Sequence, residues 1–124
     1  MAKPGSTLVV LVVEDDWIIR AGIVIALRTA GLATLESGDG ETAVAILLNG
    51  GPPIDLIFTD IQLGGSVDGW DVADAFRRAN PNVQVIYTSG NAKERSRCVR
   101  GSVFFDKPYN TADVVAACRV LLST

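Results

Sequence analysis

The chain has 124 residues, 48% of them hydrophobic and 20% charged, a composition typical of one globular domain and not of a disordered segment. Its formal net charge of −3 provides no basic field for nucleic acid, and its apolar runs are too short to span a membrane. We therefore expect a single cytoplasmic domain over residues 1–124, with its core at about residues 7–123, that binds neither nucleic acid nor membranes and carries no effector domain.

Histidine is absent, and the two cysteines do not form a C-x-x-C motif. The absence of histidine excludes a phosphohistidine carrier, a Ser-His triad and most zinc sites. Cys98 and Cys118 are expected to be reduced packing residues.

Five apolar runs bounded by polar residues, glycine or proline indicate β-strands. They lie near residues 7–13, 32–36, 55–59, 83–88 and 102–106. Helical patterns separate the runs, and this alternation predicts a doubly wound α/β fold with a parallel sheet between layers of helices.

The helical patterns have apolar residues at three- and four-residue spacing and are bounded by capping residues, glycine or proline. They cover about residues 16–30, 37–48, 70–79 and 110–122. A further segment, residues 91–101, holds few apolar residues and no sustained helical stripe. We expect it to form one or two helical turns or a loop.

Polar residues follow four of the predicted strands. Glu-Asp-Asp at residues 14–16 follows the first, Asp60 the third, Ser89 the fourth and Lys107 the fifth. In an open parallel α/β sheet, ligands bind in the crevice beyond the carboxyl ends of the strands. Clustered carboxylates with one hydroxyl and one ammonium suit a divalent cation and a phosphoryl group, because magnesium prefers oxygen ligands and lysine is a compact positive charge.

Four motifs carry a resemblance to a known family. They are Val-Val-Glu-Asp-Asp at 12–16, Thr-Asp-Ile-Gln-Leu-Gly-Gly at 59–65 with Asp-Gly at 68–69, Thr-Ser-Gly at 88–90, and Lys-Pro-Tyr at 107–109. In this order, each after a predicted strand, they resemble the receiver domain of two-component response regulators over nearly the whole chain. The resemblance implies a flavodoxin-like (βα)5 fold, a five-stranded parallel sheet in a three-layer sandwich.

The resemblance also implies an activity and the residues that perform it. Asp60 matches the phosphoacceptor, which takes a phosphoryl group from a sensor histidine kinase or a histidine phosphotransfer protein. Glu14 and Asp15, together with Asp60 and the backbone carbonyl of Gln62, match the ligands of a magnesium or manganese ion.

Three further roles follow from the same resemblance. Lys107 matches the ammonium that pairs with the phosphoryl group, and Ser89 matches the hydroxyl that hydrogen-bonds it. Phe104 matches the aromatic side chain that changes rotamer on phosphorylation, although an aromatic residue in a central strand is ordinarily part of the core. Asp16 has two interpretations, a helix cap or a group at the metal site.

The chain departs from the commonest family pattern in several places. Residues 64–67 lengthen the loop after the acceptor, Ser89 replaces a more frequent threonine, and Phe104 a frequent tyrosine. The segment from Ser89 to Lys107 is also short for the family, and the shortening falls in the weak helical segment. The shortening argues against dimerisation through the face that this helical segment would form.

The first predicted helix has an apolar outer face. A helical wheel places Trp17, Ala21 and Val24 away from the core, and Ile18 and Ile25 on one flank. Our hypothesis is that a docking patch of Trp17, Ile18, Ala21 and Ile25 contacts the kinase helices. The alternative is scattered surface apolar residues, which are normal.

Three functions are compatible with the sequence. The first is a stand-alone receiver, monomeric or dimerising on phosphorylation, that signals by protein contact or phosphorelay to a downstream protein and turns over no separate substrate. The second is a receiver module excised from a hybrid histidine kinase or larger regulator. The third, a metal-dependent phosphatase-like enzyme, is disfavoured because such enzymes have an Asp-x-Asp nucleophile motif at the first strand, whereas Asp15 is followed by Asp16 and Trp17.

Overall fold

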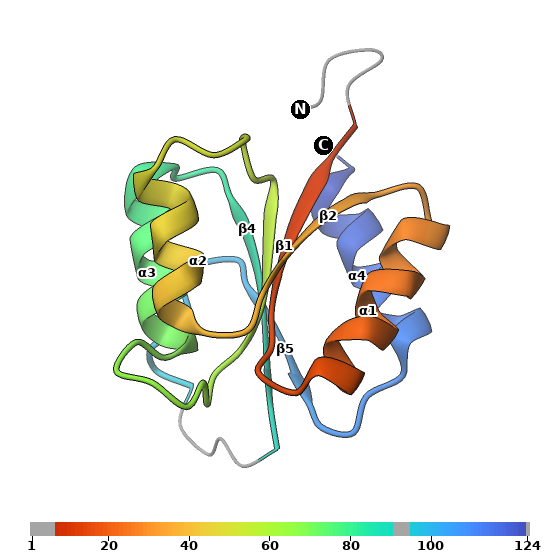
Figure 1. The fold of residues 1–124 in the computed structure, drawn as a ribbon. Coiled ribbons are helices and arrows are strands. Elements are labelled where there is room, and N and C mark those ends of the chain that lie inside the picture. Colours follow the sequence, from red (N-terminus) through yellow and green to blue (C-terminus); the bar gives the residue numbers. More distant parts are fainter. Residues whose placement is uncertain (1–6, 91–94, 124) are drawn as a thin grey trace.

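The computed structural model describes residues 7–90 and 95–123, and Figure 1 shows the arrangement of their helices and strands. The strands are β1 (Val9–Val13), β2 (Ala33–Ser37), β3 (Leu56–Asp60), β4 (Gln84–Ser89) and β5 (Val103–Asp106). The helices are α1 (Trp17–Thr29), α2 (Gly40–Leu48), α3 (Gly69–Ala79) and α4 (Thr111–Leu122). Within these ranges, no helix has the length and apolar character needed to cross a bilayer.

All five strands form one parallel sheet in the order β2-β1-β3-β4-β5. This is the flavodoxin-like order, and it confirms the predicted doubly wound fold. The chain crosses from one side of β1 to the other, so the topological switch point lies between β1 and β3. In this fold class, that is where a ligand crevice is expected at the carboxyl ends of the strands.

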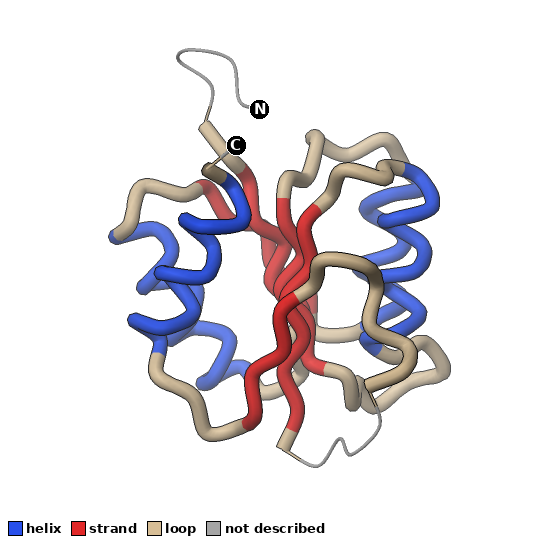
Figure 2. Tube along the Cα trace, turned by 180° about the vertical axis from the view of Figure 1, so that it is seen from behind, coloured by secondary structure: helices blue, strands red, loops and turns tan. Residues whose placement is uncertain are grey.

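The sheet lies between two pairs of helices, as the views from opposite sides show (Figure 1 and Figure 2). Side chains from α1 and α4 pack against one face, where Val12, Phe58 and Leu27 belong to one buried cluster. Side chains from α2 and α3 pack against the other face, around Leu11, Ile57 and Phe76. Burial on both faces explains why the strands read as continuous apolar runs and not as alternating ones.

A polar side chain caps the start of each helix. Asp16 accepts hydrogen bonds from the amides of Ile18 (2.9 Å) and Ile19 (3.2 Å), and Asn110 accepts one from Ala112 (2.8 Å). At α3, Asp68 and Asp71 form a capping box, in which each side chain accepts from the other residue's backbone amide. The structure thus confirms the helix-cap interpretation of Asp16.

The wheel prediction for α1 is wrong at Val24. This side chain is 5% exposed and packs in the cluster between α1, α4 and the sheet, whereas the wheel placed it away from the core. The apolar stripe of α1 is wide because α1 contacts α4 as well as the sheet. A wheel centred on one buried line of residues underestimates the buried width of such a helix.

The weak segment between β4 and β5 forms no helix in its described part, residues 95–102, and residues 91–94 lie outside the described ranges. Side chains from the neighbouring elements hold its backbone instead. The Tyr87 hydroxyl accepts a hydrogen bond from the Val99 amide (3.1 Å), and Arg77 Nη1 donates to the Arg100 carbonyl (2.9 Å). The sequence of the segment lacks the apolar stripe that would pack a helix against the sheet. These two contacts give hydrogen-bond partners to the Val99 amide and the Arg100 carbonyl, which have no helical partner.

Candidate functional site

The polar residues singled out by the sequence gather at one edge of the sheet. Glu14 and Asp15 directly follow β1, Asp60 and Ser89 are the last residues of β3 and β4, and Lys107 follows β5. The strand register aligns these ends, since Asp60 pairs with Thr88 and Ser89 with Asp106. Parallel pairing therefore brings residues from four strands into one crevice at the switch point.

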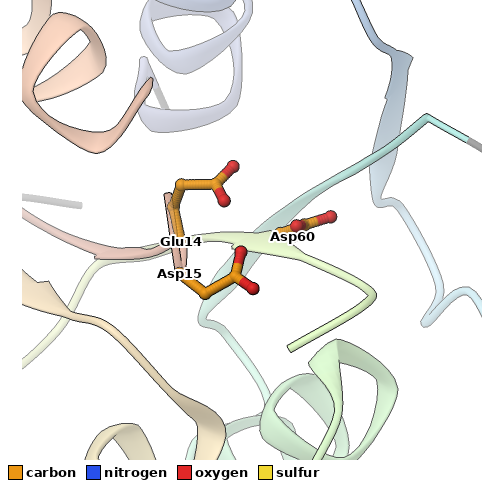
Figure 3. Close-up of side chains that lie close together, drawn as sticks. All are labelled: Glu14, Asp15 and Asp60. Carbon is orange, nitrogen blue, oxygen red and sulfur yellow. The ribbon is translucent and has the colours of Figure 1, made fainter. Parts of the chain in front are cut away.

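Glu14, Asp15 and Asp60 form an acidic cluster (Figure 3). One carboxylate oxygen from each lies within 4.8 Å of the others. Glu14 is fully buried and Asp60 is 6% exposed, whereas Asp15 is exposed at the mouth of the crevice. Three converging carboxylates fit a hard divalent cation, because such ions take oxygen ligands and compensate the repulsion among them.

Lys107 brings a positive charge to the acidic cluster. Its Nζ lies 2.8 Å from Glu14 Oε1 and 3.2 Å from Asp60 Oδ2. Its backbone amide also donates to the Ser89 carbonyl (2.9 Å), which fixes the start of the β5–α4 loop beside β4. The ammonium group of Lys107, which follows the edge strand β5, therefore joins the ends of β1 and β3.

Burial dominates the electrostatics of the site. It raises the pKa of Asp60 above the usual range, although the charge and hydrogen bond of Lys107 act in the opposite direction. The pKa of Glu14 is raised for the same reason, again against a hydrogen bond from Lys107. Burial alone would lower the pKa of Lys107, but its contacts with Glu14 and Asp60 outweigh that effect and raise it.

Several hydrogen bonds hold Glu14 in place. Its carboxylate Oε2 accepts from the Asp16 amide (3.1 Å), and its backbone amide donates to the Ser37 carbonyl (3.0 Å). Arg20 Nη1 donates to the Glu14 carbonyl (2.7 Å) while its Nε pairs with Glu36 (3.2 Å). No motif in the sequence indicates this contact of Arg20, which joins α1 to the ends of β1 and β2.

The loop after Asp60 is fixed at both ends. The Ile61 amide donates to the Thr88 carbonyl (3.0 Å), and the Gly69 amide donates to the Ile61 carbonyl (2.8 Å). A β-carbon at Gly69 would collide with the backbone carbonyl of Asp60, so only glycine fits this close approach. Gln62 is exposed and lines a depression with Asp15 and Asp68, while its backbone carbonyl as a metal ligand stays a prediction.

The two predicted switch residues lie on neighbouring strands. Ser89 is 1% exposed at the end of β4, next to the acceptor strand. Phe104 is half-buried on β5, with its ring centroid 6.4 Å from that of Tyr87. The Arg95 guanidinium carbon lies 3.9 Å from the centroid of the Phe104 ring, and Arg95 also pairs with Asp106 (3.1 Å).

The predicted docking patch is exposed at three of its four residues. Trp17, Ile18 and Ile25 are 69%, 65% and 66% exposed, while Ala21 is half-buried. Ile18 also lines an apolar groove that runs from the start of α1 to the loop around Lys107 and Tyr109. The patch is therefore continuous with the rim of the acidic site.

Comparison with known proteins agrees with this architecture. The family model described as the response regulator receiver domain matches residues 10–119. The alkaline phosphatase synthesis transcriptional regulatory protein SphR of Synechococcus elongatus is 30% identical over 132 residues, which cover 98% of this chain and 50% of that protein. The sensor kinase CckA of Brucella abortus is 31% identical over 90 residues, which cover 73% of this chain and 9% of the kinase.

A solved structure matches over the whole domain. The crystal structure of a response regulator receiver protein from Sinorhizobium medicae has a TM-score of 0.89 and 30% identity, covering 96% of this chain and 97% of that one. Among the curated relatives, this chain spans about half the length of the transcriptional regulators it matches.

The fold and the site together define a parallel α/β domain with an acidic cluster and a lysine at the switch point of its sheet. The family match over residues 10–119 gives that class its name: the chain belongs to the response regulator receiver domain family of bacterial two-component systems. Receiver domains are signalling modules that interact with histidine kinases or phosphotransfer proteins.

Proposed function

We propose that the chain is a phosphoacceptor receiver in which Asp60 takes a phosphoryl group from a sensor histidine kinase or a histidine phosphotransfer protein. The observation that carries the proposal is the surrounding of Asp60. Its carboxylate is 6% exposed, has Lys107 Nζ at 3.2 Å, and belongs to an acidic cluster suited to magnesium or manganese. A buried carboxylate that lies beside a lysine, in a cluster that could hold a metal ion, is suited to receive a phosphoryl group.

The transfer needs little covalent chemistry from the protein. A carboxylate oxygen of Asp60 attacks phosphorus, the bond from phosphorus to the imidazole nitrogen of the donor breaks, and its electron pair stays on that nitrogen, which takes a proton from solvent. In this proposal, Lys107 neutralises the arriving phosphoryl oxygens, and the Ser89 hydroxyl donates a hydrogen bond to one of them. A cation held by Glu14, Asp15, Asp60 and the Gln62 carbonyl would supply further charge neutralisation and orient the acceptor oxygen.

Phosphoacceptance can be tested without the natural donor. The protein is incubated with magnesium and acetyl phosphate, and intact masses are compared for wild type, Asp60→Asn and the matched control Asp74→Asn on the surface of α3. We expect one added phosphoryl group on wild type and Asp74→Asn and none on Asp60→Asn. Addition to Asp60→Asn would refute Asp60 as the sole acceptor, and no addition to wild type would refute acceptance from small donors.

We further propose that the docking patch contacts the kinase or phosphotransfer helices. Its exposed apolar side chains adjoin the acidic site, so a partner seated there would hold its phosphohistidine near Asp60. Ile25→Glu is expected to slow transfer from the partner by tenfold or more, on the order of a lost apolar contact, while leaving acetyl phosphate labelling unchanged. Leu48→Glu, at an exposed residue of α2 (77%), is the matched control. Equal transfer rates for both variants would refute the docking proposal.

For the output, we propose that Ser89 and Phe104 respond to phosphorylation and that the changed surface is read by a downstream protein or passed on by phosphorelay. Phe104 contacts Arg95 from the segment before β5, whose described part forms no helix, so a rotamer change would alter that segment directly. We propose two settings for the domain, a stand-alone receiver or a module of a hybrid kinase or regulator. The longer relatives support the second setting. In neither setting do we propose turnover of a separate substrate.

A further inference from the structure

Arg20 of α1 links its helix to the ends of two strands. Its Nη1 donates to the backbone carbonyl of Glu14 at 2.7 Å, and its Nε pairs with Glu36 of β2 at 3.2 Å. Glycine at position 38 leaves room for the guanidinium group, because a β-carbon there would lie only 3.3 Å from Nη1. The guanidinium group thus occupies the corner between α1, β1 and β2.

The Glu14 carbonyl belongs to the peptide group that joins Glu14 to Asp15. The buried side of this link is already fixed, since the Glu14 amide donates to the Ser37 carbonyl (3.0 Å) and its carboxylate accepts from the Asp16 amide (3.1 Å). Arg20 holds the carbonyl itself. Because a peptide group is planar, holding its oxygen also fixes where the α-carbon of Asp15 lies.

Asp15 is the member of the acidic cluster that most needs such support. Its side chain is exposed, whereas Glu14 is fully buried and Asp60 is 6% exposed, so packing holds it least. One carboxylate oxygen of each lies within 4.8 Å of the others, and this spacing depends on the direction in which the chain leaves β1.

The charge of Arg20 cannot be its contribution to cation binding. A positive group near a cation site repels the cation, so charge alone would weaken binding there. The Glu36 carboxylate compensates the guanidinium charge, which leaves a rigid donor with two fixed partners. Hydrogen bonds that orient the ligands of a metal ion typically contribute 10–100-fold to its affinity.

We propose that Arg20 is a positioning residue for the cation site, which acts by holding the peptide group between Glu14 and Asp15. It keeps the exposed Asp15 carboxylate beside the two buried ones and is not itself a ligand. The inference rests on the proposed function, in which these three carboxylates bind the cation, and adds a residue to it.

Arg28 provides a matched control on the same helix. Its Nε donates to Thr34 Oγ1 at 2.8 Å, so it also links α1 to β2. Thr34 is in register with Val10 near the start of β1, away from the acidic cluster. Arg20→Met and Arg28→Met therefore each remove one arginine link between α1 and β2, and only Arg20→Met frees the Glu14 carbonyl.

The test measures magnesium affinity by isothermal titration calorimetry for wild type, Arg20→Met, Arg20→Lys and Arg28→Met. The urea midpoint of each protein in EDTA shows that it is folded. We expect Arg20→Met to weaken magnesium binding roughly tenfold and Arg28→Met to stay within about twofold of wild type. Arg20→Lys keeps the charge and one donor for the carbonyl, so its affinity should lie between those of wild type and Arg20→Met.

Magnesium affinity of Arg20→Met equal to or tighter than that of wild type would overturn the inference and leave the proposed function intact. An equal loss in Arg28→Met would overturn it as well, because the effect would then come from the docking of α1. So would an Arg20→Lys protein that binds no more tightly than Arg20→Met, since a donor to the carbonyl would then be without effect. Failure of wild type to bind magnesium would overturn the cation site of the proposed function and the inference with it.

Discussion

Replacing Asp60 by asparagine is expected to stabilise the metal-free protein at neutral pH. The acceptor carboxylate is buried near two other carboxylates, and its raised pKa shows that the folded protein disfavours its charged form. An isosteric amide keeps the shape of the side chain and removes the charge. The residue that the proposed function needs most is therefore one that the metal-free fold would be more stable without.

The magnitude follows from competing terms. At an effective dielectric constant near 20, one repulsion across 4.8 Å is worth about 3.5 kcal/mol, and the attraction to Lys107 across 3.2 Å about 5 kcal/mol. Since Asp15 is exposed, its repulsion is discounted by roughly half, and the Coulomb terms then nearly cancel. Burial decides the sign: an ion loses several kcal/mol on desolvation and a neutral amide roughly 1–3, which leaves an expected gain of about 1–2 kcal/mol.

The assay is urea denaturation in EDTA at pH 7, followed by the fluorescence of Trp70, which is 9% exposed in the folded domain. Asp74→Asn is the matched control, because Asp74 pairs with Arg97 at the surface (3.0 Å) and its loss is expected to cost about 0.2–1 kcal/mol. The two substitutions thus change the same chemical group with opposite expected signs.

A pH series separates this explanation from a general effect of the substitution. Because its pKa is raised, the folded Asp60 takes up its proton at a higher pH than the unfolded residue does, so the advantage of asparagine should shrink as the pH falls toward 4. A destabilised Asp60→Asn at pH 7, or a gain that is equal at pH 4 and pH 7, would refute the reasoning.

Three further predictions concern the same region. The pKa values of Glu14 and Asp60 are raised on folding, so the metal-free protein should melt at a higher temperature at pH 5 than at pH 7. With saturating magnesium, the melting temperature should instead be higher at pH 7. If it is higher at pH 5 both with and without magnesium, these carboxylates are excluded as metal ligands. Lys107→Met leaves two buried carboxylates without their cation, and we expect a loss of about 2 kcal/mol in urea at pH 7, with no loss counting against the observed bridge. Asp68→Ala removes the capping box of α3 and should cost about 1 kcal/mol by the same assay, and an unchanged midpoint would show that the box is not stabilising.

The strands were predicted almost completely from the sequence, and their ends show why small errors arose. Two strands expected at residues 32–36 and 55–59 lie at Ala33–Ser37 and Leu56–Asp60. The sequence interpretation ended each strand at the last apolar residue or the one beyond it. Backbone ladder bonds continue through a polar residue when its neighbour is in register, as the pairing of Asp60 with Thr88 shows.

The acidic cluster was predictable for a related reason, since residues that end parallel strands meet at one edge. The contacts between the side chains of the site could not be predicted from the sequence. Lys107 and Glu14 are 93 positions apart, and no local pattern indicates that the ammonium bridges two carboxylates. The Arg20 contact with the Glu14 carbonyl likewise depends on how α1 packs on the sheet.

The ends of the domain have a consequence for how it can be joined to other polypeptides. β1 starts and α4 ends at the same edge of the sheet, opposite the edge that carries Asp60 and Lys107 (Figure 1). A tether attached before Val9 or after Leu122 would leave the crevice open to an approaching donor. The domain can therefore be fused to another polypeptide at either terminus, or inserted between other domains, without covering the crevice that holds Asp60 and Lys107.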